Sequence, residues 1–130
     1  MAESALLVDT DVLIDYLKGI RAARAVLDSG RLEIYYSSWT RKELLSKGGL
    51  AESERQEIEE LLVRFRIVLV GDAIAEKYWL LLDKYKSRGL RQADAIIAAT
   101  AWQKQLPLLT RNQKHFKFIE EIKVAPIYTL

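Results

Sequence analysis

The most restrictive feature of the sequence is an apolar run, residues 6–8, that ends at Asp9 and resumes after Asp11 with a different periodicity. The run suits a strand buried on both faces, as in a parallel sheet, and the segment that follows has helical spacing. Ligands of open α/β sheets gather outside the carboxyl ends of the strands, where Asp9 would lie. Because a buried carboxylate is costly unless it is paired, hydrogen-bonded or bound to a cation, Asp9 is expected to have partners elsewhere. Asp11 has a structural alternative, as the N-cap of the following helix.

The rest of the chain alternates between short apolar runs and amphipathic segments, which is typical of an α/β domain with right-handed crossovers. With 130 residues, 50% of them hydrophobic, the chain is expected to form one domain, residues 1–130. We predict three layers, α/β/α, around a mainly parallel sheet of about five strands. The expected strands are residues 6–8, 32–36, 67–70, 106–110 and a last one within 122–128. The expected helices are residues 12–18, 21–29, 40–47, 53–65 with a capping box of Ser53 and Gln56, 72–85 and 93–103.

The composition limits the cellular compartments and the classes of binding partner that are expected. The sequence contains no cysteine, which excludes disulfides and thiolate metal sites and is typical of a reducing compartment. No apolar stretch approaches membrane-spanning length and no secretory signal is recognisable, so we expect a cytoplasmic protein without a membrane partner. Lys and Arg number 20 against 18 Asp and Glu. If a metal ion engages several of the acids, the remaining surface favours a polyanion such as nucleic acid. Basic clusters at residues 41–42, 84–88 and 111–114 are candidates for that surface, and each alone also fits a solvated face.

Three acids stand at the same expected edge of the sheet. Asp9 follows the first strand, Glu43 lies in the helix after the second strand, and Asp94 begins the helix at residues 93–103. Neighbouring strands are about 5 Å apart, so side chains distant in the sequence can converge on one ion at this edge. Taken singly, Glu43 fits an exposed helical position and Asp94 fits a favourable charge in the first turn of a helix.

The segments that contain these acids are distinctive together: residues 9–15, 43–44, 93–101 and 110–116. In order, and over almost the whole chain, they closely resemble the PIN domain family, in particular its VapC-type ribonuclease toxins. The resemblance implies a PIN-fold nuclease that hydrolyses RNA with Mg²⁺ or Mn²⁺. It also implies a homodimer that is neutralised by a cognate antitoxin protein. By this resemblance Asp9, Glu43 and Asp94 are the catalytic and metal-binding residues.

One position departs from the family pattern. Many PIN domains carry a fourth acid after the penultimate strand, where this chain has Asn112. An amide oxygen can bind a metal or a water without adding charge, so we expect Asn112 to take part in catalysis while weakening metal binding. Its alternative role is to hold the turn after Thr110 through a side-chain hydrogen bond. The single histidine, His115, fits a surface or local hydrogen-bonding role and is left outside the site.

Two other functions remain open from the sequence. A strand followed by Asp9 and Asp11 also resembles the haloacid-dehalogenase-like phosphohydrolases, in which Asp9 would attack phosphorus and Asp11 would act as the acid. That hypothesis leaves residues 93–101 and 110–112 unexplained. Asn112 suggests instead an inactive PIN-fold module that binds RNA or protein, although the three retained acids favour an enzyme.

The early helices contain a surplus of large apolar residues. We predict that these residues line exposed grooves where a second copy and the antitoxin bind. They are Val12, Leu13, Tyr16, Leu17 and Ile20.

Overall fold

The computed structural model of the protein describes residues 4–126. No helix in this range is long and apolar enough to cross a membrane. The described residues form four strands, six α-helices and two short 3₁₀ helices. In chain order these are β1 (Ser4–Val8), α1 (Thr10–Leu17), α2 (Arg21–Leu27), β2 (Leu32–Ser37), α3 (Ser38–Leu45), α4 (Glu52–Leu62), β3 (Arg66–Val68), α5 (Asp72–Lys84), η1 (Lys86–Arg88), α6 (Gln92–Lys104), β4 (Leu108–Leu109) and η2 (Gln113–His115).

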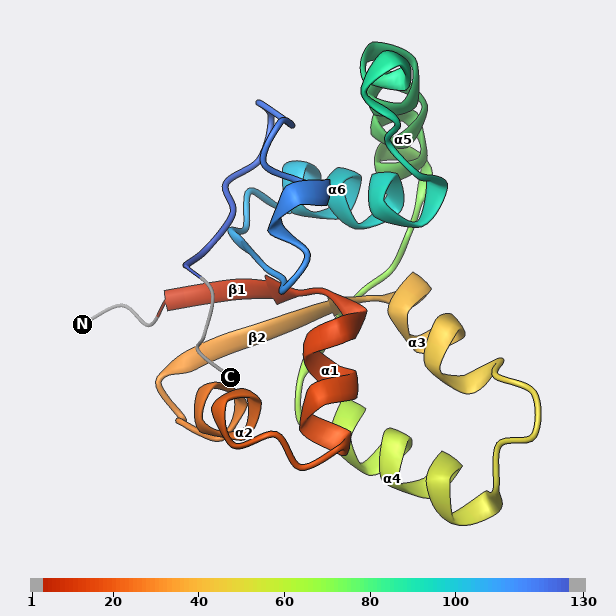
Figure 1. The fold of residues 1–130 in the computed structure, drawn as a ribbon, viewed down its shortest axis with the longest axis vertical. Coiled ribbons are helices and arrows are strands. Elements are labelled where there is room, and N and C mark those ends of the chain that lie inside the picture. The colour runs from red at the N-terminus through yellow and green to blue at the C-terminus, as the bar shows by residue number, and fades with distance from the viewer. Residues whose placement is uncertain (1–3, 127–130) are drawn as a thin grey trace.

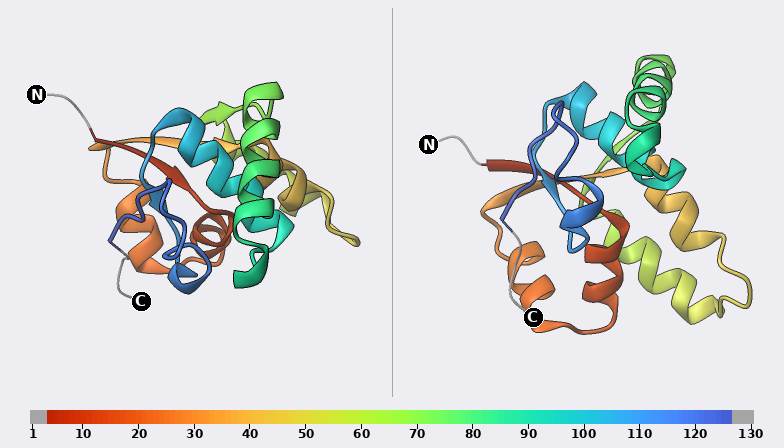
Figure 2. Two further views of the ribbon diagram at one scale, coloured as in Figure 1. Left: turned by 90° about the horizontal axis from the view of Figure 1, so that it is seen from above. Right: turned by 45° about the horizontal axis from the view of Figure 1, so that its top comes forward.

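The predicted three-layer α/β/α architecture is confirmed (Figure 1). All strand pairs are parallel, in the order β3-β2-β1-β4. Helices α5 and α6 cover one face of the sheet, and α1, α2 and α4 cover the other, as Figure 1 and the right view of Figure 2 show. Side chains alternate across a strand, so Leu7 packs in the cluster beneath α5 and α6 while Val8 packs beneath α1, α2 and α4. Both are fully buried, which explains the unbroken apolar run that precedes Asp9.

The outer strands are shorter than predicted. Strand β3 stops at Val68, and the backbone N–H of Val70 donates to the hydroxyl of Ser38 instead of continuing the ladder. Strand β4 has two residues because Pro107, just before it, has no N–H to donate. The predicted last strand is represented by one parallel bridge between Leu108 and Val124. The end of its predicted range, residues 127–128, lies outside the described residues.

The start of α4 differs from its predicted cap. The N-cap is Ala51, and the carboxylate of Glu54 accepts the backbone N–H of Ala51 at 3.1 Å. The predicted capping box of Ser53 and Gln56 is therefore wrong. Alanine has no side-chain acceptor, so only the half of the box that the acidic residue supplies is present.

The prediction of an exposed apolar face on the early helices is wrong for Val12 and Leu13. Both are fully buried in the cluster beneath the sheet, because α1 follows β1 directly and packs back against it. Tyr16, Leu17 and Ile20 are half-buried. The large apolar side chains that are exposed lie instead near β3 and on α5: Val63, Ile67, Leu69, Trp79 and Leu80.

Candidate functional site

Asp9 lies at the carboxyl end of β1, where the chain turns into α1. Its Oδ1 accepts the backbone N–H of Thr10 at 2.8 Å, and its Oδ2 accepts the hydroxyl of Thr110 at 2.8 Å. Asp9 is the N-cap of α1, so the alternative that Asp11 is the cap is wrong. Because β1 and β4 are neighbours in the sheet, the segments after these two strands meet at Asp9.

The electrostatics of Asp9 are set by its surroundings. The residue is only 7% exposed, and its pKa is raised from 3.8 to about 7. Burial is the largest cause, followed by the negative charge of Asp11, and the charge of Asp94 acts in the same direction, whereas the hydrogen bonds from Thr110 and Thr10 oppose the rise. The field of Asp94 therefore reaches Asp9, and the structure brings these two predicted residues to one site. A cation placed there would favour the ionised carboxylate.

Glu43 is held at the same site through hydroxyl groups. Its Oε1 accepts the hydroxyl of Thr10 at 2.7 Å, one residue after Asp9. Thr10 has one hydroxyl proton, so in its 3.0 Å contact with Thr40 the donor is Thr40. Thr40 is fully buried. These two bonds fix α3 against the start of α1 and hold the Glu43 carboxylate on Thr10, the residue that follows Asp9.

Asp94 lies in the first turn of α6, with its side chain 14% exposed. Its Oδ2 is 3.2 Å from Nε of Arg91 and 3.4 Å from Nδ1 of His115, while Nη2 of Arg91 is 2.7 Å from the same Nδ1. A guanidinium only donates, so Nδ1 of His115 accepts from Arg91. Asp94 and His115 are therefore both hydrogen-bond acceptors of Arg91, which bridges them. Their own contact is not an ion pair. His115, which the sequence left outside the site, lies at its edge, and the three-residue spacing of Arg91 and Asp94 was the signal available for this pairing.

Asp11 and Arg111 connect the start of α1 to the segment after β4. Oδ2 of Asp11 accepts the backbone N–H of Arg111 at 2.9 Å, and its Oδ1 is buried without a hydrogen-bond partner. Burial raises the pKa of Asp11, and the hydrogen bond from Arg111 opposes that rise. The guanidinium of Arg111 contacts the buried carboxylate of Asp15 at 2.5 Å. Residues 111–114 therefore do not present a single basic face to solvent.

Asn112 lies in the exposed turn after Thr110. Its backbone N–H donates to the hydroxyl of Thr110 at 3.0 Å, and its carbonyl accepts the backbone N–H of His115 at 2.9 Å. Its side chain makes no capping hydrogen bond to η2. The backbone of Asn112 and the hydroxyl of Thr110, and not the amide side chain of Asn112, therefore hold this turn.

The donor set fits a hard divalent cation. Asp9, Asp11 and Glu43 offer carboxylate oxygens at this site, and Mg²⁺ and Mn²⁺ prefer oxygen ligands. Within residues 4–126, no three His, Asp or Glu side chains are grouped closely enough to hold one ion. Mg²⁺ usually keeps several waters and takes only one or two carboxylates. Asp9 and Asp94, whose charges interact, are two candidate carboxylates, and the buried Oδ1 of Asp11, which has no hydrogen-bond partner, is a further acceptor next to Asp9.

The acids at the strand ends and the parallel α/β/α architecture have a clear match among known proteins. The chain belongs to the PIN domain family, whose model matches residues 6–121, a range that contains every acid of the site. A relative named Ribonuclease VapC10, from Mycobacterium tuberculosis, is 37% identical over 122 residues, which cover 91% of this chain and 90% of the relative. The family resemblance predicted from the sequence is confirmed, and the haloacid-dehalogenase alternative is wrong.

Solved structures agree with the fold. The structure described as a toxin-antitoxin complex from Klebsiella pneumoniae is 34% identical, with a TM-score of 0.76 over 90% of this chain and 94% of that one. The crystal structure of VapBC2 from Rickettsia felis, bound to a DNA fragment from their promoter, gives a TM-score of 0.84 over 96% and 99% of the two chains. At 22% identity this second likeness concerns the fold alone.

Proposed function

We propose that the protein is a metal-dependent endoribonuclease of the VapC type, which hydrolyses phosphodiester bonds of RNA at the site around Asp9. The observation that carries this proposal is the state of Asp9, a buried carboxyl at the end of a central strand, with a pKa of about 7 beside Asp11 and Asp94. Grouped carboxyl groups of this kind destabilise a fold and favour a bound cation. The name of the Mycobacterium tuberculosis relative supports RNA as the substrate.

Each residue of the site would have a separate role in metal binding or catalysis. Asp9 and Asp94 would hold Mg²⁺ or Mn²⁺ directly, and Glu43 would accept a hydrogen bond from a water that the ion carries. A bound divalent ion would supply a Lewis acid that activates water and stabilises charge on the phosphate. Thr110 donates to Asp9 and so fixes the direction in which its remaining lone pairs point. The amide oxygen of Asn112 would add an uncharged acceptor at the turn after β4.

The test is RNA cleavage by the purified chain with Mg²⁺, with Mn²⁺ and with a chelator. We expect cleavage that needs the metal and that falls by about 10²-fold or more in Asp9→Asn and in Asp94→Asn. Asp83→Asn is the matched control, because Asp83 is 84% exposed on α5. Metal-independent cleavage, or full activity of Asp9→Asn, would contradict the proposal. A folded natural chain that binds RNA and cuts none would favour the inactive binding module that Asn112 suggests.

We further propose that the protein forms a homodimer and is neutralised by a cognate antitoxin. The solved toxin-antitoxin complex from Klebsiella pneumoniae supports such a partner. A hollow of about 510 Å³ opens beside Glu43 and suits the apolar face of an antitoxin helix. An RNA substrate would place the activity in the cytoplasm. The apolar residues that line the hollow are Ile14, Leu17, Leu44, Leu50 and Ile58.

A further inference from the structure

A second hollow, of about 300 Å³, opens on the α6 side of Asp94. Three Arg and Lys residues line it from three separate elements. Arg88 ends η1, Arg91 is the N-cap of α6, and Lys114 lies in η2. Segments that are distant in the sequence therefore converge on one basic hollow at the edge of the acidic site.

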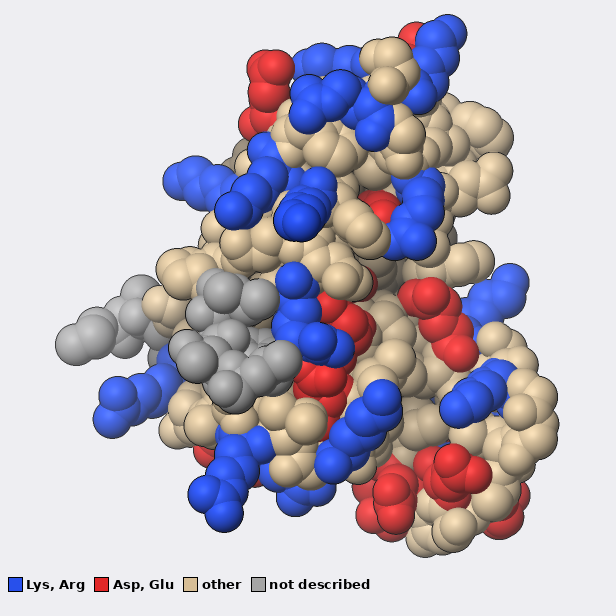
Figure 3. All heavy atoms as spheres, in the orientation of Figure 1, with Lys and Arg blue, Asp and Glu red and all other residues tan. Residues whose placement is uncertain are grey.

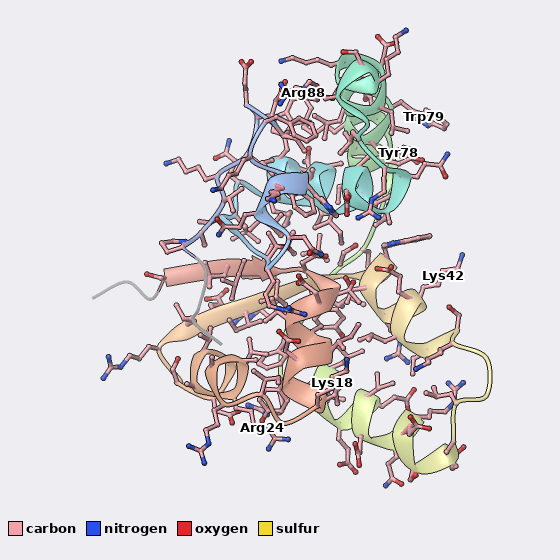
Figure 4. All side chains as sticks on the ribbon, in the orientation of Figure 1. Lys18, Arg24, Lys42, Tyr78, Trp79 and Arg88 are labelled. Carbon is pink, nitrogen blue, oxygen red and sulfur yellow. The ribbon has the colours of Figure 1, made fainter. Side chains whose placement is uncertain are left out.

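The charge balance of this hollow is positive. Among the described residues, Asp94 is the only acidic one that lines it, and Arg91 already pairs with that carboxylate. Neither Arg88 nor Lys114 has a carboxylate partner within residues 4–126. The guanidinium of Arg88 lies 4.8 Å above the ring of Phe118, which also lines the hollow. Figure 4 shows Arg88 on the side of α5 that faces the segment after β4.

The surrounding surface extends the same charge. On the face drawn in Figure 3, Lys and Arg side chains gather over α5, α6 and the segment after β4. Acidic side chains gather near the centre of this face and over α4. A polyanion that reaches the acidic centre would therefore meet its most favourable approach from the side of α6.

We propose that the hollow lined by Arg88, Arg91 and Lys114 binds a backbone phosphate of the RNA, next to the phosphodiester bond that is cut. This inference rests on the proposed ribonuclease function and specifies how the substrate is held. Guanidinium and ammonium groups are the side chains that bind phosphate best. Arg91 separates the phosphate from Asp94, and the ring of Phe118 supports the guanidinium of Arg88 from below. Asp94 lines this hollow and its charge also acts on Asp9, so a phosphate held here would place the adjacent bond beside the acids.

The first test measures RNA binding without cleavage. Anisotropy of a short fluorescein-labelled oligouridylate is followed over a range of salt concentrations, in an Asp9→Asn background. The double variant Arg88→Gln with Lys114→Gln should bind about tenfold more weakly, and its salt slope should fall by roughly 0.7, the value for one phosphate contact on a single strand. Arg21→Gln with Arg31→Gln removes the same charge from residues that do not line the hollow, since Arg21 begins α2 and Arg31 directly precedes β2. This control should change the affinity by less than about twofold.

The second test uses the active protein and separates binding from chemistry. The double variant Arg88→Gln with Lys114→Gln, called the pocket variant below, should raise KM about tenfold and keep kcat. A contact made equally in the ground state and the transition state affects KM alone. Arg88→Lys with Lys114→Arg keeps both charges and should restore most of the affinity. This variant also separates the effect from lost packing of Arg88 on Phe118.

The outcomes distinguish this inference from the proposed function. Equal KM values and equal salt slopes in the pocket and control variants would overturn the phosphate site while the ribonuclease proposal stands. A natural chain that cuts no RNA, but loses oligouridylate binding in the pocket variant, would overturn the ribonuclease proposal and leave the phosphate site in place.

Discussion

The raised pKa of Asp9 gives the metal-free protein a definite dependence of stability on pH. Between pH 3.8 and about 7 the folded protein keeps a proton on Asp9 that the unfolded chain has released. The stabilisation that protonated Asp9 contributes is therefore fully present below its unfolded pKa of 3.8, and it is lost as the pH rises through its folded pKa of about 7. We expect the free energy of unfolding to fall by roughly 4 kcal/mol across this window. Urea unfolding in a chelator, at mildly acidic and mildly alkaline pH, measures the difference.

The matched variants make this prediction specific. Asp9→Asn should flatten most of the pH dependence, because the amide does not titrate, while Asp83→Asn should keep it. Asp11, whose pKa is also raised by burial, should leave a smaller residual slope of the same sign. An Asp9→Asn protein with the full slope of the natural chain would show that another group is responsible.

Asn112 offers a second prediction for a single residue. Asn112→Asp adds a negative charge in the turn after Thr110, and the backbone hydrogen bond that holds this turn is kept. We expect Mn²⁺ to bind about tenfold more tightly, since the added attraction exceeds the added repulsion in the empty site by about 1 to 2 kcal/mol. Mn²⁺ titration followed by thermal unfolding and by RNA cleavage measures the change. Weaker metal binding by Asn112→Asp, or full activity in Asn112→Ala, would contradict a role for Asn112 in the site.

The individual acids were easier to predict than their contacts. Asp9 was recognisable because a carboxylate closes an apolar run, and Asp94 because it opens a nearly all-apolar helix. The sequence contained no comparable signal for the donation from Thr110 to Asp9. That contact exists only because β4 pairs with β1. Such partners follow from the order of strands in the sheet, which local pattern does not encode.

At the scale of elements, α3 depends on the buried hydroxyl of Thr40 for its position against α1. Thr40→Val removes one donor and keeps the shape of the side chain, so we expect a loss of about 1 kcal/mol of stability. Thr10 still donates to Glu43 in this variant, so cleavage should fall modestly, and Thr40→Ser, which keeps the donor, should cleave RNA as the natural chain does. Urea unfolding of Thr40→Val and of the natural chain measures the difference in stability. A Thr40→Val protein as stable as the natural chain would show that packing alone positions α3.

Elements with strong periodicity were predicted closely, and those with few residues were not. The helices expected at residues 72–85 and 93–103 are present as α5 (Asp72–Lys84) and α6 (Gln92–Lys104). The lengths of the two outer strands were overestimated, because the backbone N–H of Val70 donates to a side chain outside the sheet and Pro107 has no backbone N–H to donate. The burial of Val12 also escaped prediction, since the direction of α1 across the sheet is a tertiary property.

At the scale of the whole molecule, the exposed apolar side chains on α5 predict self-association. Trp79 is 65% exposed and Leu80 is 55% exposed, and Figure 4 shows Trp79 pointing away from the body of the protein. Trp79→Glu should convert the proposed homodimer to a monomer, because a charge in an apolar interface stays unpaired and desolvated. Sedimentation velocity measures the change, and Asp83→Ala on the same helix should remain a dimer. A natural chain that is monomeric at all concentrations would contradict the prediction.

The parallel pairing of β1 with β4 also has a consequence for the time at which the site can exist. Asp9 receives its hydroxyl partner from a residue 101 positions later in the chain, and proteins emerge from the ribosome with the N-terminal part first. A nascent chain that has not yet exposed Thr110 holds the first acid of the site without its partner strand. For a protein that cuts RNA, this order of assembly would keep the growing chain harmless to its own message until translation has passed β4.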